Sequence, residues 1–214
     1  MLLALARLNQ VCGGRVLLDG VDTAALPLAT LRTAVAVIPQ EPHLFSGTVR
    51  FNLDPFGAYS DAAVWAALDA TQLRGLVADL PGQLQGRVAE GGSTWSAGQR
   101  QLLSLARALL HRRQLVLLDE ATASVDHASD QRIQRMLRTD QAFAGATLVV
   151  IAYRIDTVLD SDVVLVLEKG QLAEMGPPQA LIAKGGAFAA MVAASKNAMG
   201  EKRGRPAKEL EVLG

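Results

Sequence analysis

Cysteine is nearly absent from this chain, and neither sign of charge is in excess. The 214 residues contain one cysteine, Cys12, and their formal net charge is zero. A single cysteine excludes an internal disulfide framework and fits a reducing compartment, and we expect Cys12 to be a small residue of the core. Zero net charge means that global electrostatics does not favour nucleic acid or an acidic membrane surface as a partner.

Long hydrophobic runs are also missing. No apolar stretch approaches the roughly twenty residues that a helix needs to cross a bilayer. The opening segment Met1–Leu8 is apolar, but it has no basic start, Arg7 interrupts it, and no cleavage-like sequence follows. It therefore predicts an interrupted amphipathic helix rather than a signal peptide. Any membrane association must then come from another chain or another segment.

The pattern that is present is that of an α/β domain. Helical periods are clearest over residues 62–70 and 99–110. Val35–Ile38 is predicted to be a buried-type strand that Pro39 stops. Apolar, partly β-branched runs of strand length occur at Leu115–Leu118, Thr147–Ile151 and Val163–Leu167. Such runs, separated by helical segments, predict parallel strands covered on both faces. A turn at residues 168–171 predicts a hairpin into a further strand.

The segment Ser96-Ala97-Gly98-Gln99 precedes a long helical period and permits two interpretations. Serine followed three residues later by glutamine, ahead of an apolar run, is a capping box, which is a purely structural feature. The same geometry suits a phosphate, because a helix N-terminus presents free N–H groups and the positive end of a dipole. Gly98 would let phosphate oxygens approach closely, and the Ser96 hydroxyl would add a hydrogen bond.

Two carboxylates, Asp119 and Glu120, follow the apolar run at 115–118. Acids at the end of a buried strand are common, so the pair alone is compatible with an ordinary strand end. As catalytic groups, Asp119 would hold Mg²⁺ directly or through water, and Glu120 would orient the attacking water and accept its proton. Gln40 follows another strand, and it is either a further metal and water contact or a polar residue at a strand exit.

The order and spacing of these motifs, continued by Ser124-Val125-Asp126, resemble the ATP-binding cassette (ABC) ATPases from residue 1 to about 193. The stretch Thr48–Pro55 looks like the second nucleotide-binding domain of C-subfamily exporters, the multidrug-resistance-associated group. The resemblance implies a P-loop NTPase-like α/β core without its N-terminal β portion. It also implies a helical subdomain at about 48–112 and a flexible charged tail at 194–214.

In that family two such domains sandwich two ATP molecules head to tail, and the resemblance implies roles for the motifs. The residues that would bind the γ-phosphate of the partner's ATP are Ser96, Ala97, Gly98 and Gln99. Gln40, Asp119 and Glu120 would serve this domain's own Mg²⁺-ATP site. Asp126 would link the two sites across the interface.

The resemblance also implies partners and a place in the cell. The partners would be a second nucleotide-binding domain and the transmembrane domains of an exporter. The chain would then be the ATP-driven motor domain at the cytosolic face of a membrane. Nothing in the sequence identifies the transported substrate.

Three departures from the family pattern bear on activity. The chain contains no Gly-x-x-Gly-x-Gly-Lys-Ser/Thr loop, the Walker A motif, so we expect ATP binding at its own site to fail in the isolated chain. Tyr153 stands where the family has its switch histidine, and a neutral phenol would make hydrolysis slow. Trp95 and Ala97 replace the usual leucine and glycine of the signature. The histidines are elsewhere, and we expect all three to face solvent: His43, His111 and His127.

Three other interpretations stay open. The chain could be a catalytically silent partner that donates its signature turn to a complete cassette. It could be a soluble ABC ATPase of DNA repair or translation, since Lys202–Pro206 weakly resembles an AT-hook, although a solvated tail is favoured there. Finally, Met1 could be the artefact of a truncated gene model. The missing strands would then leave the isolated chain poorly stable, with exposed apolar edges.

Overall fold

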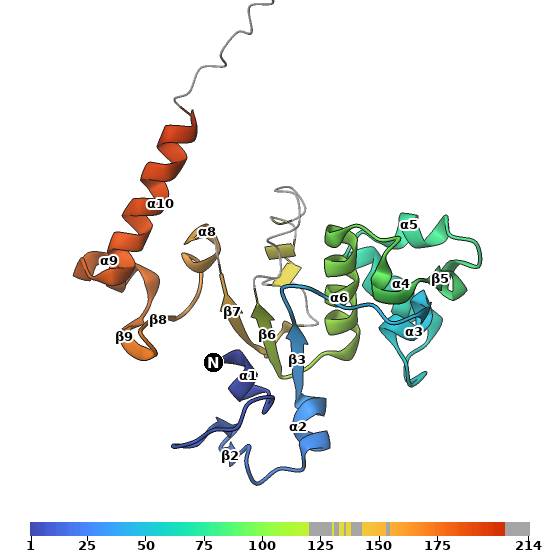
Figure 1. Cartoon of the computed structure of the whole chain (residues 1–214), viewed down its shortest axis with the longest axis horizontal. Helices are drawn as coiled ribbons and strands as arrows, with labels where there is room; N and C mark the ends of the chain where they lie inside the picture. The colour runs from blue at the N-terminus through green and yellow to red at the C-terminus, as the bar shows by residue number, and fades with distance from the viewer. Residues whose placement is uncertain (120–129, 131–132, 135, 138–142, 153–154, 204–214) are drawn as a thin grey trace, which may run out of the picture. The chain divides into compact units, whose positions relative to one another are not determined.

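A parallel sheet forms the centre of the first of two compact units. The structure is a computed structural model that describes residues 1–119, 130, 133–134, 136–137, 143–152 and 155–203. The chain divides into the units Met1–Ile151 and Ala152–Gly214. In the first unit, β3 (Val35–Ile38), β6 (Leu115–Asp119) and β7 (Thr147–Ile151) form a three-stranded parallel sheet in the order β3-β6-β7 (Figure 1). The prediction of parallel strands is confirmed for the runs at 115–118 and 147–151, and the predicted strand at 35–38 pairs parallel in the same sheet.

Burial differs between the strands of this sheet. The central strand β6 is buried from Leu115 to Leu118. On β7, in contrast, Val150 is 43% exposed and Ile151 is 40% exposed. The expectation that the strands are covered on both faces is therefore wrong for β7. On β3, the other edge strand of the described sheet, Val37 is likewise 40% exposed, so the expectation fails at that position as well.

Helix α6 (Ala97–His111) joins this sheet to the helical part of the unit. It has two apolar faces, each with the spacing of three and four residues that keeps side chains on one side of a helix. The residues that pack among the other helices are Leu103, Ala106 and Leu110. Those that pack on the sheet beside Ile38 and Leu118 are Leu105, Ala108 and Leu109. Because both faces are buried, α6 ties the two parts of the unit together.

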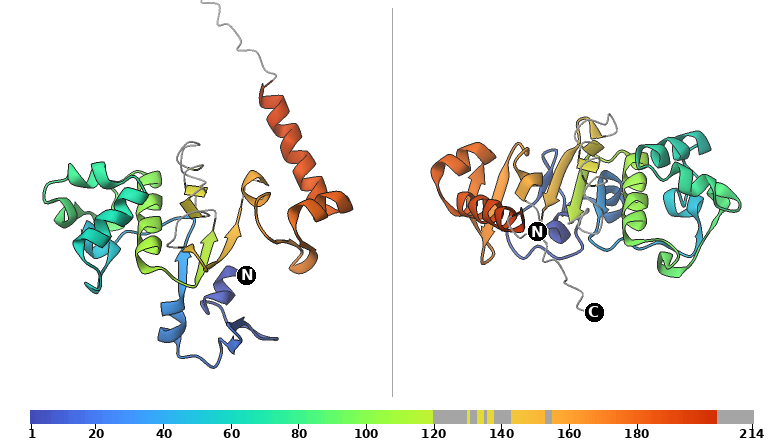
Figure 2. Two further views of the ribbon diagram at one scale, coloured as in Figure 1. Left: turned by 180° about the vertical axis from the view of Figure 1, so that it is seen from behind. Right: turned by 90° about the horizontal axis from the view of Figure 1, so that it is seen from above.

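The helical part follows the sheet strand β3 in sequence. Its elements are β4 (Gly47–Thr48), α3 (Val49–Leu53), α4 (Asp61–Ala70), α5 (Arg74–Ala78), the 3-10 helices η1 (Gln83–Gln85) and η2 (Glu90–Gly92), and β5 (Arg87–Val88), which pairs antiparallel with β4. Figure 2 shows the helices gathered on one side of α6. The Thr48 and Ser60 side chains accept hydrogen bonds from the first turns of α3 and α4, as N-cap residues do. The mainly helical character predicted for this stretch is confirmed.

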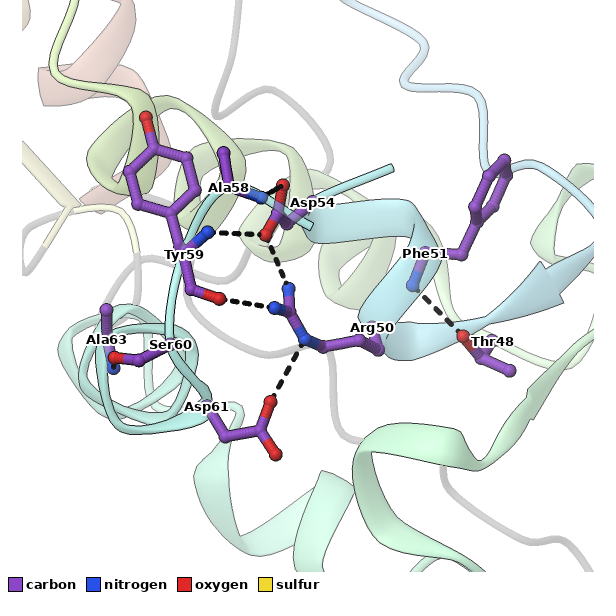
Figure 3. Close-up of polar contacts among 9 residues, drawn as sticks. All are labelled: Thr48, Arg50, Phe51, Asp54, Ala58, Tyr59, Ser60, Asp61 and Ala63. Carbon is purple, nitrogen blue, oxygen red and sulfur yellow. Dashed lines mark hydrogen bonds and ion pairs between the residues drawn. The ribbon is translucent and has the colours of Figure 1, made fainter. Parts of the chain in front are cut away.

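A buried ion pair organises the loop between α3 and α4 (Figure 3). Arg50 donates to the Asp54 carboxylate at 2.8 Å, and it also donates to Asp61 at 3.1 Å and to the Tyr59 carbonyl. The backbone N–H groups of Ala58 and Tyr59 donate to Asp54 at 3.0 and 2.9 Å. Burial raises the pKa of Asp54, but the hydrogen bonds from Tyr59, Arg50 and Ala58 outweigh it and leave that pKa below its ordinary value.

The N-terminal segment differs from its prediction. Helix α1 spans only Leu2–Leu5, because Arg7 adopts a left-handed φ of 50° and leaves the helical path. The Arg7 guanidinium donates instead to the carbonyls of Thr23 and Leu26 at 2.8 and 2.6 Å. The hairpin strands β1 (Leu17–Leu18) and β2 (Val21–Asp22) and helix α2 (Leu28–Ala34) complete this segment. The expected core position of Cys12 is wrong, since the residue is exposed in the loop between α1 and β1.

The second unit is built on a hairpin. Its elements are α8 (Ile155–Val158), β8 (Val164–Glu168), β9 (Gln171–Gly176), α9 (Pro178–Lys184) and α10 (Ala187–Arg203). Strand β8 pairs antiparallel with β9, which confirms the predicted hairpin and corrects the prediction of a parallel strand at 163–167. Val164 and Val166 are buried, whereas Leu165 and Leu167 are 44% and 48% exposed. One face of β8 therefore packs on the core of the second unit and its other face is exposed, as is common for antiparallel strands.

The first turn of helix α10 is hydrogen-bonded to an acidic side chain, and the helix extends into the residues for which the sequence predicts a tail. The Phe188 N–H donates to the buried Glu174 carboxylate at 2.9 Å, so an acid accepts from an N–H of the first turn that has no partner within the helix. The helix then continues to Arg203, through residues for which the sequence predicts a flexible tail. Residues 204–214 lie outside the described part. Within the described residues, no helix is both long enough and apolar enough to cross a membrane.

Candidate nucleotide site

Two predicted site residues follow neighbouring strands of the parallel sheet. Ile38, the last residue of β3, is the register partner of Leu118, so Gln40 and Asp119 come just after paired positions. The carboxyl ends of parallel strands meet at one edge of a sheet, which is where ligands of open α/β folds bind. Gln40 is exposed and Asp119 is half-buried. The structure therefore places an amide and a carboxylate at the same sheet edge.

The next pair in the register extends this edge. Asp119 on β6 is the register partner of Ile151, the last residue of β7. Glu120 and Tyr153 follow these positions in the sequence, but both lie outside the described residues, as does Asp126. Their catalytic and interface roles stay predictions from the sequence.

The donors at this edge fit a magnesium ion held jointly with phosphates. Among the described residues, no group of three or more His, Cys, Asp or Glu side chains gathers to hold a metal. Mg²⁺ in nucleotide sites takes one or two protein oxygens and completes its shell with water and phosphate oxygens. Asp119 and Gln40 offer a carboxylate and an amide oxygen. The chemistry of these two donors is compatible with a Mg²⁺ ion that is also bound by phosphate oxygens.

The signature turn opens α6 with the predicted capping box. The Gln99 N–H donates to Ser96 Oγ at 3.1 Å, and the Ser96 N–H donates to Gln99 Oε1 at 2.9 Å. Ser96 and Ala97 are exposed. The capping interpretation is confirmed, and it does not exclude the phosphate interpretation. Ser96 Oγ accepts in the cap, so its own O–H remains a possible donor to a phosphate.

A buried tryptophan directly precedes this turn and anchors it to the core of the helical part. Trp95 is 5% exposed and belongs to the core of the helical part. Its carbonyl accepts a 2.7 Å hydrogen bond from Arg100, one turn into α6. Before it, Gly92 has a φ of 66°, and a Cβ there would lie 2.8 Å from Leu44 Cδ1. Trp95 thus replaces the family's usual leucine as a core anchor, and it leaves Ser96 at the surface.

The histidines divide between exposed and half-buried positions. His43 is exposed, as predicted, and His127 lies outside the described residues. The prediction of solvent exposure is wrong for His111, which is half-buried with its ring edge-on to Tyr59 at a centroid distance of 5.2 Å. Desolvation by burial and the nearby Arg113 charge lower the pKa of His111 below its ordinary value. It ends α6, on the opposite end from the signature turn.

Sequence reasoning missed a residue that joins the two predicted regions. Gln101, in the first half of α6, is 2% exposed and donates to the Pro39 carbonyl at 3.3 Å. Pro39 directly precedes Gln40, so the signature helix is bonded to the Gln40 segment. The available signal was a polar residue among the apolar residues of a helix whose two sides are both buried.

Comparisons with known proteins agree with these features. The sequence model of the family described as "ABC transporter" matches residues 1–123. The chain is 47% identical over 192 residues to "Multidrug resistance protein mrp-7" of Caenorhabditis elegans, an alignment that covers 89% of this chain and 12% of that protein. It is 45% identical over 195 residues to "ATP-binding cassette sub-family C member 8" of Homo sapiens, covering 91% of this chain and 12% of that protein.

A solved structure is similar as well. "Structure of a bacterial Atm1-family ABC exporter with ATP bound" matches with a TM-score of 0.83 and 32% sequence identity, and covers 97% of this chain and 35% of that one. The chain spans only 12% of the length of the curated relatives named above.

Proposed function

The chain belongs to the ABC transporter family, and from this premise we propose that it is the nucleotide-binding domain of a multidrug-resistance-associated type of exporter. Gln40 follows β3 and Asp119 ends the paired strand β6 at the same sheet edge, and this observation carries the proposal. The 45–47% identity to C-subfamily and multidrug resistance proteins supports it over a soluble repair or translation ATPase. The domain would act at the cytosolic face of a membrane, with a second nucleotide-binding domain and transmembrane domains as partners.

In this proposal the chain's residues act on two ATP molecules. Asp119 and Gln40 would hold Mg²⁺, which neutralises phosphate charge when bound. Glu120 would accept a proton from water as the water oxygen bonds to the γ-phosphorus and the bond to the bridging oxygen of ADP breaks. Tyr153 would donate its O–H to the γ-phosphate. Ser96 would donate its O–H to the ATP of the partner domain.

Replacing the proposed general base tests this function. In the full-length protein, Glu120→Gln is expected to lower kcat for ATP hydrolysis at least about 100-fold and to leave nucleotide affinity within about threefold. Initial rates and nucleotide titrations measure the two effects. Glu168→Gln is a matched control, because Glu168 also ends an apolar strand and is exposed. Equal loss in both variants, or full activity in Glu120→Gln, would contradict the proposal.

An exposed aromatic side chain supports a partner on the helical part. Phe56, in the loop held by the Arg50–Asp54 pair, is 91% exposed, and Phe45 and Phe51, earlier in the sequence, are 61% and 45% exposed. Large aromatic residues at a surface are typical of interaction sites. We assign this surface to contact with the transmembrane domains, because these are the additional partner that the family implies.

Cysteine labelling tests this contact. Phe56→Cys, with Cys12→Ser to remove the chain's own exposed thiol, is expected to react with a maleimide at least about tenfold more slowly in the assembled transporter than in the 214-residue chain. Mass spectrometry of the peptide measures the labelling rate. Asp79→Cys, at an exposed position beyond α5, should label equally in both. Equal labelling of position 56 in both states would refute the contact.

A further inference from the structure

The first half of α6 is bonded to the segment that carries Gln40. Gln101 is 2% exposed and lies two residues beyond the signature turn. Its Nε2 donates to the Pro39 carbonyl at 3.3 Å, across a sequence separation of 62 residues. A carbonyl can only accept, so the Pro39 oxygen fixes which end of the Gln101 amide faces it. The contact is therefore a directed link between α6 and the end of β3.

Within the described part of the chain, the other end of the same amide has no partner. Among the described residues, Gln101 Oε1 is buried without a hydrogen-bond donor. Buried polar atoms are nearly always paired, and an unpaired one costs stability. An apolar side chain of similar size would fill this place without that cost. The polar amide at position 101 is thus better explained by its link to Pro39 than by packing.

The two ends of this link meet different nucleotides in the proposed function. Ser96–Gln99, at the start of α6, would contact the γ-phosphate held by the partner domain. Gln40, next to Pro39, would contact Mg²⁺ and water at the chain's own site. Arg107, farther along α6, donates to the Asn52 carbonyl at 2.7 Å. The hydrogen bonds of Gln101 and Arg107 thus attach α6 to the 39–52 segment at two points along the helix. A shift of the signature turn is therefore transmitted to the 39–52 segment.

We propose that Gln101 is a positioning residue that couples the signature turn to Gln40. Engagement of the partner's ATP by the signature turn moves the start of α6, and the Gln101–Pro39 hydrogen bond carries this displacement to the backbone next to Gln40. Nucleotide binding at one site of the sandwich then changes the geometry of the other site through the buried Gln101 amide. This inference rests on the proposed function, because it needs both nucleotide contacts.

Non-additivity of substitutions at the two ends measures the coupling. Affinity for a non-hydrolysable ATP analogue with Mg²⁺ is measured in the full-length transporter for Ser96→Ala, Gln40→Ala and their combination. The same three variants are then made together with Gln101→Met. We expect the combined effect to differ from the product of the single effects by about fivefold, and by less than twofold with Gln101→Met. A purely structural role of Gln101 would lower stability but leave this ratio unchanged.

Control variants separate coupling from damage to α6. Ser104 is another buried polar residue of the same helix, at 5% exposure, and Ser104→Ala should preserve the fivefold ratio. Gln101→Leu repeats the test if thermal unfolding shows that Gln101→Met is poorly folded. A fivefold ratio that persists without Gln101, or no coupling in the wild type, would overturn the inference alone. Single substitutions at 96 and 40 that leave affinity unchanged would overturn the proposed function and the inference with it.

Discussion

Ser96→Asp is expected to leave the folded chain as stable as the wild type and to weaken ATP binding between the paired domains about 100-fold. Aspartate, asparagine and serine are comparably good N-cap residues. A carboxylate at a helix N-terminus also interacts favourably with the helix dipole. The cap of α6, in which Ser96 Oγ accepts from the Gln99 N–H at 3.1 Å, is therefore kept.

The loss in binding comes from charge. Ser96 would face a γ-phosphate of the partner's ATP, and aspartate there would place two negative charges side by side and remove the O–H donor. Two unit charges about 4 Å apart repel by about 4 kcal/mol at an effective dielectric constant of about 20. Because each 1.4 kcal/mol corresponds to about tenfold in affinity, a 100-fold loss is a conservative expectation.

Ser96→Asn separates the two roles of this residue. Asparagine preserves the cap without charge, so its effect on nucleotide affinity should be less than about tenfold. Nucleotide titration of the full-length protein gives the affinity, and urea unfolding of the chain gives the stability. If aspartate and asparagine weaken binding equally, the turn does not face a phosphate. If both lower the stability strongly, the cap geometry differs from the one described.

The elements that the sequence predicts well are those specified by local patterns. The strand runs at 35–38, 115–118 and 147–151 are continuous and apolar, and each forms a strand of the parallel sheet. The capping box at Ser96 and Gln99 is a spacing of three residues and forms as predicted. Such features depend on neighbours in the sequence, so one chain is sufficient to find them.

The features that escaped prediction depend on contacts between distant segments. Gln101 meets Pro39 across 62 residues, and no local pattern marks this pair. His111 is half-buried because Tyr59 packs against it from another segment. Cys12 is exposed because its loop has no regular structure to pack it, although cysteine is usually a buried residue type.

The catalytic half of the site is a mixed case. The register that brings Gln40 and Asp119 to one sheet edge follows from parallel pairing, and the sequence predicts both strands. Glu120, Asp126 and Tyr153 lie outside the described residues, so their roles still depend on the family resemblance. Tyr153 departs from the pattern that the resemblance implies, so its role is a proposal made from this sequence alone.

Asp54→Ala is expected to lower the free energy of unfolding of the chain by about 3–5 kcal/mol, as removal of one partner of a buried ion pair does. The Asp54 side chain is completely buried, and it accepts from Arg50 and from the N–H groups of Ala58 and Tyr59 (Figure 3). Without it, two backbone donors and one N–H of the half-buried Arg50 guanidinium lose their acceptor. Urea unfolding with an unchanged m-value measures the loss.

The second carboxylate on the same arginine is the matched control. The Asp61 side chain is 68% exposed at 3.1 Å from Arg50 Nε, so Asp61→Ala should cost less than about 1 kcal/mol, as exposed pairs do. Because the pKa of Asp54 is lowered in the folded chain, its contribution is complete above the ordinary value of 3.8 and is lost as the pH falls through the folded pKa. The difference in stability between wild type and Asp54→Ala should therefore be constant at neutral pH and shrink as the pH falls below 3.8. Equal costs at 54 and 61 would mean that the pair acts as a surface contact and does not hold the loop that presents Phe56.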